Sequence, residues 1–229
     1  SIGYWLQNAL TNEFEKRNIA KPVISVVTQV RVDKEDPSFK KPSKPIGPFY
    51  TKEEADAEAA KDGSTYVEDA GRGYRKVVPS PMPKEIVEKE AVRALVEADV
   101  LTICSGGGGI PVVAEDGQYV GVEAVNDKDF SARVLAENVD ADRLIILTGV
   151  DNIYINYNQP DQKALEQISV AEAEEYIKEG HFAAGSMLPK IEAALDFVKG
   201  DDKRKAIITS IENLENIDKE AGTVISQKG

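Results

Sequence analysis

Four consecutive glycines follow a short apolar run near the middle of the chain. The run covers residues 100–104, and residues 105–109 read Ser-Gly-Gly-Gly-Gly. Glycine has no Cβ, so its backbone N–H groups can turn inward and approach an anion closely. The segment predicts a phosphate-binding loop formed by Ser105, Gly106, Gly107, Gly108 and Gly109. A flexible turn without a ligand is the alternative.

The spacing of these glycines excludes two common nucleotide-binding motifs. A Gly-x-Gly-x-x-Gly motif would need a third glycine where Pro111 or Val112 stands. The nearest approach to a Walker A loop, residues 180–187, has Ser186 in the position of the phosphate-binding lysine. Neither a dinucleotide site nor a Walker A site is therefore expected.

Two other loops place a lysine in the first turn of a predicted helix. Residues 126–130 read Asn-Asp-Lys-Asp-Phe, with Asp127 as a candidate N-cap, and residues 185–190 end in Lys190. A cation at this end of a helix opposes the macrodipole and is tolerated best when a bound anion compensates. Isolated surface lysines are the alternative. Together with the glycine turn, Lys128 and Lys190 suggest a cradle for polyphosphate and hence phosphoryl transfer.

The elements that must position these loops alternate between apolar strands and amphipathic helices. Strands are predicted near residues 23–30, 100–104, 144–147 and 206–209. Helices are predicted near residues 2–14, 86–96, 127–138, 169–178 and 186–198. This alternation indicates an α/β fold with a mainly parallel sheet, in which ligands bind beyond the carboxyl ends of the strands.

A proline-rich segment interrupts the alternation. Residues 33–50 contain four prolines, which break helices and central strands. A capping box at residues 51–54 then starts a short helix that Gly63 closes, and short strands are predicted near Tyr66 and residues 74–78. Residues 33–83 are therefore predicted to form a lobe inserted into the α/β body.

Composition limits the classes of partner. The chain has 229 residues and a formal charge of −12, so nucleic acid and membrane surfaces are not expected partners. One cysteine and one histidine exclude an internal disulfide and a His-rich zinc site. With neither a long apolar run nor a signal peptide in the sequence, a cytoplasmic location is expected.

Seven segments, in order along nearly the whole chain, resemble carbamate kinases. They are residues 1–10, 44–49, 68–73, 77–81, 106–111, 127–129 and 180–190. The resemblance implies the amino-acid kinase fold, a three-layer αβα sandwich with a small protruding lobe, over residues 1–229. It also implies reversible phosphoryl transfer between carbamoyl phosphate and ADP, giving ATP and carbamate. The family usually works as a homodimer at the ATP-yielding end of arginine fermentation.

The family pattern also implies a role for each matching residue. Lys128 and Lys190 would bind the transferred phosphoryl group, Asp129 would hold both lysines, and Lys44 on the lobe would close over carbamoyl phosphate. The glycine turn would supply N–H groups on the acceptor side. The nucleotide side would comprise Thr148, Gly149, Val150, Asp151, Tyr157, Ser186, Met187 and Lys190. Mg²⁺ would be held mainly through nucleotide phosphates and water, with no dedicated protein ligand.

The start of the chain departs from the family pattern. Family members begin with a strand that ends in Gly-Gly-Asn and carry a further Gly-Asn-Gly-Pro segment, and this sequence contains neither. We therefore expect this sequence to be an N-terminally incomplete part of an active enzyme. Two alternatives stay open: another phosphotransferase of the amino-acid kinase family, which would generally lack the motif at residues 44–49, and a non-catalytic nucleotide-binding remnant.

Overall fold

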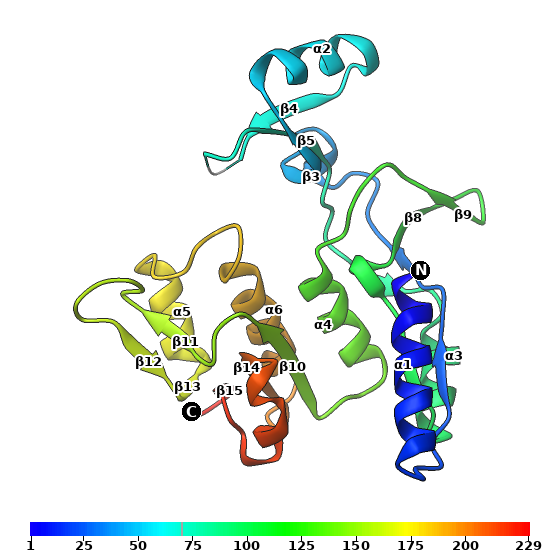
Figure 1. The fold of residues 1–229 in the computed structure, drawn as a ribbon, viewed down its shortest axis with the longest axis vertical. Helices are drawn as coiled ribbons and strands as arrows, with labels where there is room; N and C mark the ends of the chain where they lie inside the picture. The colour runs from blue at the N-terminus through cyan, green and yellow to red at the C-terminus, as the bar shows by residue number, and fades with distance from the viewer. Residues whose placement is uncertain (70) are drawn as a thin grey trace. The chain divides into compact units, whose positions relative to one another are not determined.

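The computed structural model describes residues 1–69 and 71–229. Ala70, within the motif at residues 68–73, lies outside the described residues. The chain divides into two compact units, Ser1–Ser131 and Ala132–Gly229. The boundary falls inside helix α4 (Lys128–Asn138) (Figure 1).

Outside its lobe, the first unit contains two small sheets, and each of them includes one parallel pair of strands. Strand β1 pairs with β7, and β2 pairs with β8 in a sheet of order β6-β2-β8-β9. The strands are β1 (Val23–Ser25), β2 (Gln29–Arg31), β6 (Glu85–Ile86), β7 (Leu101–Ile103), β8 (Ile110–Glu115) and β9 (Gln118–Gly121). Helix α1 (Ile2–Lys16) contacts β1, and α3 (Lys89–Glu97) contacts β7. The Ser25 side chain and backbone fasten α1, donating to the Gly3 carbonyl at 2.9 Å and to the Gln7 side chain at 2.7 Å.

The lobe of this unit is a three-stranded antiparallel sheet with one helix. Its strands β3 (Lys44–Tyr50), β5 (Tyr74–Val78) and β4 (Thr65–Glu68) lie in that order, and α2 (Lys52–Asp62) packs on them. The predicted capping box of α2 is confirmed, as is its closure by Gly63 in the left-handed conformation. The bulge in β3 is held by Arg75, which donates to the Gly47 carbonyl at 3.0 Å and lies over the Phe49 ring.

The second unit contains a four-stranded mixed sheet of order β10-β14-β15-β13 and a separate β11-β12 hairpin. The strands are β10 (Arg143–Thr148), β11 (Ile153–Ile155), β12 (Lys163–Leu165), β13 (Gln167–Ser169), β14 (Lys205–Ser210) and β15 (Thr223–Ser226). Helices α5 (Val170–Lys178) and α6 (Leu188–Lys199) pack on each other and on this sheet. The parallel β10-β14 pair ends at Thr148 and Ser210, so the loops after both strands open at the same edge.

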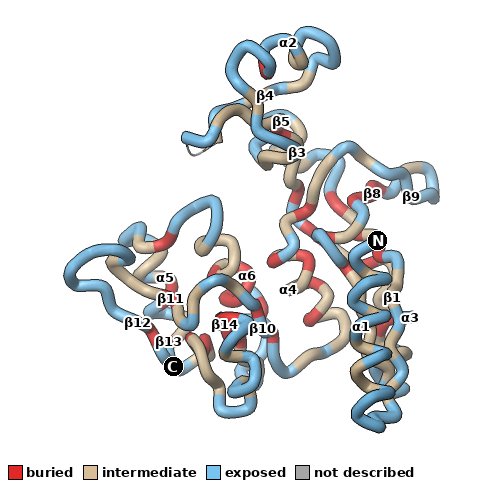
Figure 2. The backbone as a smooth tube through the Cα atoms, in the orientation of Figure 1, coloured by how far each residue is buried: buried red, intermediate tan, exposed pale blue. Residues whose placement is uncertain are grey.

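Burial is concentrated in the second unit (Figure 2). Five of the six residues of β14 are buried, as expected for a central strand covered on both faces. Phe197 and Ile191 of α6 pack in the same apolar cluster as Ile208 and Ile225 of the sheet. Helix α1, in contrast, has no buried residue. The second unit therefore supplies a rigid base for the loops at its strand ends.

The α/β class and most of the predicted helices and strands are confirmed, with one notable correction. The predicted strand at residues 23–30 is two strands, because the chain leaves β7 after Val26 and joins β8 from Gln29 onward. Thr28 lies at this crossing, and its hydroxyl donates to the Val26 carbonyl at 3.0 Å. The antiparallel hairpins β8-β9 and β11-β12 and strands β6, β13 and β15 were not predicted. Strand β3 was also missed: the proline-rich segment does contain a strand, which lies at the edge of its sheet, where prolines are tolerated.

Candidate active site

The glycine turn after β7 has a fixed conformation. Gly107, Gly108 and Gly109 all have positive φ angles, of 67°, 101° and 75°. The Gly108 carbonyl accepts hydrogen bonds from the Asn126 amide at 3.1 Å and from the Ser131 hydroxyl at 2.8 Å. A Cβ on Gly108 would overlap the backbone oxygen of Asn126. These contacts hold Gly108 in a conformation that other residues rarely adopt.

Buried polar atoms accompany this turn. The backbone N–H of Ser105 donates to the Thr28 hydroxyl at 2.9 Å, which ties the turn to the crossing between β1 and β2. Among the described residues, neither Ser105 Oγ nor Asn126 Oδ1 has a hydrogen-bond partner, although both are buried. Such groups are uncommon in folded proteins. The turn therefore keeps unused hydrogen-bonding capacity next to its glycines.

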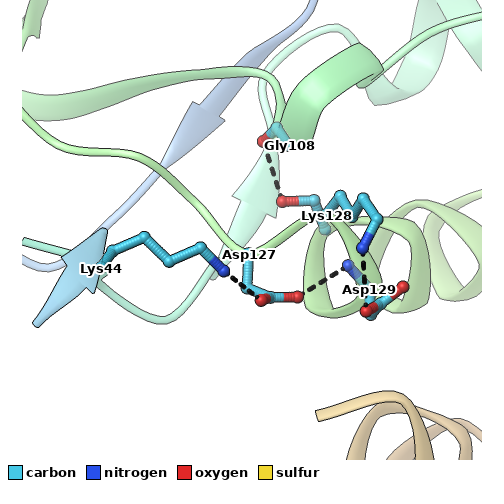
Figure 3. Close-up of polar contacts among 6 residues, drawn as sticks. Lys44, Gly108, Asp127, Lys128 and Asp129 are labelled. Atoms are coloured by element: carbon cyan, nitrogen blue, oxygen red, sulfur yellow. Dashed lines mark hydrogen bonds and ion pairs between the residues drawn. The ribbon is translucent and has the colours of Figure 1, made fainter. Parts of the chain in front are cut away.

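Helix α4 begins beside the turn with two carboxylates and a lysine. The Asp127 carboxylate accepts from the Asp129 backbone N–H at 2.9 Å, so the predicted N-cap is confirmed. Lys128 Nζ lies 3.3 Å from the Asp129 carboxylate (Figure 3). The Asp129 side chain is only 8% exposed, whereas that of Lys128 is 62% exposed. A buried carboxylate thus restrains a solvent-accessible cation at the positive end of a helix.

Lys44 reaches the same place from the first residue of β3. Its Nζ donates to the Asp127 carboxylate at 2.7 Å. Burial alone would raise the pKa of Asp127, but the hydrogen bonds from Lys44 and from the Asp129 N–H, together with the Lys128 charge, hold that pKa below its ordinary value. Asp127 is therefore an anion at neutral pH. Lys44, Asp127, Lys128 and Asp129 form a mixed-charge cluster next to the glycine turn.

The second unit carries a separate pocket of about 400 Å³ beyond the end of β10. It is lined by Thr148, Gly149, Val150, Tyr154, Tyr157, His181, Phe182, Ala183, Ser186, Met187 and Lys190. The Tyr154 and Tyr157 rings lie 6.0 Å apart, and Lys190 is the lining residue with a permanent positive charge. An apolar, aromatic pocket with a cation suits an aromatic ring that carries a negative group.

Comparisons with known proteins extend over the whole chain. The amino acid kinase family matches residues 50–210. Carbamate kinase 1 of Enterococcus faecium is 56% identical over 99% of this chain and 73% of its own length. Carbamate kinase of Lentilactobacillus hilgardii is 54% identical over 100% of this chain and 72% of its own length. The structure of carbamate kinase from Giardia lamblia bound to AMP-PNP superposes with a TM-score of 0.88 at 44% identity, covering 98% of this chain and 72% of that chain.

These matches decide the family. The chain belongs to the carbamate kinases of the amino acid kinase family. It is accordingly a phosphotransferase, and its fold is that of the solved carbamate kinases.

The site residues expected of a carbamate kinase fall into two groups, one in each unit. Lys44, Lys128, Asp129 and residues 105–109 belong to the first unit. All of the expected nucleotide-side residues except Asp151 line the pocket of the second unit. The Asp151 carboxylate instead accepts from the Ser210 hydroxyl at 2.6 Å, and its backbone carbonyl accepts from Thr209. Asp151 therefore joins the ends of β10 and β14 rather than lining the pocket.

Several residues of these two groups were not predicted from the sequence. Tyr154, His181, Phe182 and Ala183 also line the pocket, and Asn126 and Ser131 hold the glycine turn. His181 is the only histidine of the sequence, and its ring contacts Glu179 at 3.0 Å and Tyr176. In β11, Tyr154 follows the buried Ile153. Because successive side chains of a strand point to opposite faces, this pattern could have placed the Tyr154 ring outside the core.

One other side chain bears on the chemistry. Burial raises the pKa of the Cys104 thiol to about 11, so this residue is a neutral thiol and is not suited to be a nucleophile. Within residues 1–69 and 71–229, no cluster of three or more His, Cys, Asp or Glu side chains could hold a metal ion. No helix in the same described part is long and apolar enough to span a membrane.

Proposed function

We propose that this carbamate kinase transfers a phosphoryl group between carbamoyl phosphate and ADP, giving ATP and carbamate. The proposal rests chiefly on one observation: Lys44, Lys128 and two carboxylates gather beside a glycine turn whose conformation is fixed. A phosphoryl group requires cations and backbone N–H donors. The N–H groups of Gly108 and Gly109 already donate to the Ser105 and Gly106 carbonyls, so Gly106 and Gly107 are the glycines proposed to face the phosphoryl group. The names and identities of the relatives point to the same substrates.

This reaction needs no general base. In the ATP-forming direction, a terminal phosphate oxygen of ADP attacks phosphorus, and the bond between phosphorus and the carbamate oxygen breaks, so that carbamate leaves as an anion. Catalysis then reduces to in-line positioning and to neutralising the charge on the phosphoryl oxygens. Lys128 and Lys190 are proposed to supply that charge, and Asp129 to orient Lys128.

The pocket in the second unit is proposed to bind the nucleotide. Its Tyr154 and Tyr157 rings and the Met187 thioether provide an apolar wall for the adenine ring, and Lys190 provides a cation for phosphate. AMP-PNP, the ligand of the Giardia relative, is an adenine nucleotide analogue and supports this assignment.

Mg²⁺ is proposed to bind through nucleotide phosphates and water. The Asp127 and Asp129 carboxylates already accept from Lys44 and Lys128, so these carboxylates fit a role in orienting lysines better than one in holding a metal. Bound Mg²⁺ would neutralise phosphate charge, and the side chains near the phosphates would contact the Mg²⁺–nucleotide complex.

The experiment that tests the function is ATP formation from carbamoyl phosphate, ADP and Mg²⁺. We expect saturable turnover with both substrates and no turnover when acetyl phosphate replaces carbamoyl phosphate. Turnover with N-acetylglutamate or UMP as phosphoryl acceptor from ATP, in place of carbamate, would identify another amino-acid kinase activity. Binding of ADP without any turnover would identify a non-catalytic nucleotide-binding protein.

Lys44→Ala is expected to raise the KM for carbamoyl phosphate by a factor between about ten and a hundred, because a charge-assisted contact to the phosphoryl group contributes about 1.5–3 kcal/mol. The Kd for ADP should change less than twofold, since the nucleotide pocket belongs to the other unit. Steady-state kinetics and calorimetry measure the two quantities. An unchanged KM for carbamoyl phosphate would contradict the role of Lys44.

Tyr157→Ala is expected to raise the KM for ADP roughly tenfold, because an aromatic contact is worth about 0.5–1.5 kcal/mol beyond the area it buries. The Tyr157 side chain is more than half exposed, so the fold should be retained. Tyr119→Ala, at an exposed tyrosine of β9, is the matched control. Equal effects of the two substitutions on the KM for ADP would argue against the pocket as the nucleotide site.

The proposal extends to the setting of the enzyme. We infer a cytoplasmic homodimer that produces ATP during arginine breakdown, on the strength of the family resemblance. Size measurement in solution and growth on arginine as the energy source test the two parts separately.

A further inference from the structure

One ion pair connects the lobe to the start of helix α4. Lys44 is the first residue of β3, and Asp127 lies 83 positions later in the sequence. Their side chains are 36% and 16% exposed, so this contact is more protected than the exposed ion pairs elsewhere in the first unit, such as Lys61 with Glu58. Partial burial reduces solvent screening and strengthens the attraction.

Both carboxylate oxygens of Asp127 are engaged. Oδ2 accepts from Lys44 Nζ at 2.7 Å, and Oδ1 accepts from the backbone N–H of Asp129 at 2.9 Å (Figure 3). The charge of Lys128 attracts the same carboxylate. A single anion therefore lies between the two lysines of the first unit that the proposed function assigns to the phosphoryl group, and it also occupies a helix N-terminus, where phosphate binds well.

We propose that the Asp127 carboxylate is an internal surrogate for the phosphoryl group: it holds Lys44 while the site is empty and gives up that lysine when a phosphoryl anion binds. The inference rests on the proposed function and adds that the Asp127 carboxylate competes with the phosphoryl group for Lys44. The Lys44 ammonium has three N–H donors but one positive charge, so a phosphoryl group that draws it away competes with the Asp127 carboxylate for that charge. The helix cap made by Oδ1 does not depend on this exchange.

The exchange has a predictable direction. A phosphoryl group carries up to two negative charges and three oxygens, whereas Asp127 offers one charge and has one oxygen committed to the helix. A doubly charged ligand therefore displaces the carboxylate more readily than a monoanion does. Asp127 should lower the affinity for every anion but discriminate most strongly against weak ones such as acetate or chloride.

Asp127→Asn tests the exchange while keeping the helix cap. Asparagine caps helices as well as aspartate does. Its single amide oxygen can accept from the Asp129 N–H, which leaves its NH₂ group, a donor, towards Lys44. We expect the Kd for carbamoyl phosphate, measured by calorimetry, to fall about fivefold, and the inhibition constant of inorganic phosphate to fall by a similar factor.

Two controls separate this effect from general electrostatics. Glu123→Gln removes the same charge from an exposed position in the loop before α4 and should change neither constant. In a Lys44→Ala background, Asp127→Asn should tighten carbamoyl phosphate binding less than twofold, because there is no longer a lysine to release. Equal tightening in both backgrounds would overturn the proposal, and so would weaker binding in Asp127→Asn alone.

The same measurements distinguish failure of this inference from failure of the proposed function. A wild-type protein that neither binds carbamoyl phosphate nor forms ATP would refute the proposed function. A wild-type protein that does both, and whose affinity is unaltered or lowered by Asp127→Asn, would refute the surrogate role alone.

Discussion

Lys128→Ala is expected to lower kcat for ATP formation about a thousandfold, in the range seen when a cation that stabilises a phosphoryl-transfer transition state is lost. The lysine lies at the start of α4 with most of its side chain exposed, so its methylene groups contribute little to the core. The free energy of unfolding should therefore change by less than about 1 kcal/mol. Rapid-quench or coupled kinetics together with thermal unfolding measure both quantities.

Lys61→Ala is the matched control for this prediction. Lys61 is also an exposed lysine paired with a neighbouring carboxylate, but it lies on α2, away from the glycine turn. Its loss should leave kcat within a factor of two. If Lys128→Ala kept more than a tenth of the wild-type kcat, Lys128 would not be a catalytic residue.

Gly108→Ala is expected to destabilise the protein by about 2–4 kcal/mol, because the added Cβ overlaps the Asn126 carbonyl and alanine rarely adopts a φ of 101°. For a chain of this size the melting temperature should fall by roughly 5–15 °C. Activity should fall at least tenfold even below that temperature, because the turn can relieve the overlap only by moving its N–H groups. Calorimetry and initial rates at low temperature measure these effects.

Two other glycines separate the causes of this loss. Gly117→Ala also has a positive φ, of 76°, but its Cβ would meet open space, so it should cost only about 1 kcal/mol. Gly106→Ala meets open space without a positive φ and should leave the free energy of unfolding nearly unchanged. A Gly108→Ala protein as stable as the Gly117→Ala protein would show that the contact with Asn126 can relax freely.

Features of the fold that depend on local sequence were predictable. The Thr51 capping box and the Gly63 closure of α2 each depend on residues within a single helix, and both are present. The apolar run of β14 is long enough to indicate a strand buried on both faces. The change of partner at Thr28 could not be read locally, because it depends on which of two distant strands, β7 or β8, each part of the run meets.

The candidate site also has parts that local sequence predicts and parts that it does not. The glycine turn and the lysines at residues 128 and 190 were recognisable from residue type and from their places at strand and helix ends. The hydrogen bonds that fix Gly108 come from Asn126 and Ser131, about twenty positions away, and neither residue type is distinctive in sequence. The pairing of Lys44 with Asp127 depends on the path of the whole lobe, which no local pattern specifies.

The lobe has little interior of its own. Among its described residues from 44 to 78, only Ala55 and Val77 are buried, and the bulge of β3 depends on a guanidinium, that of Arg75, lying over the Phe49 ring. Regions with few buried apolar contacts open at a lower free energy than the rest of a protein. Amide protons of the lobe should therefore exchange with solvent through local opening, while those of β14 exchange only when the second unit unfolds. Local opening of the lobe should therefore leave the sheet beside the second unit's pocket intact.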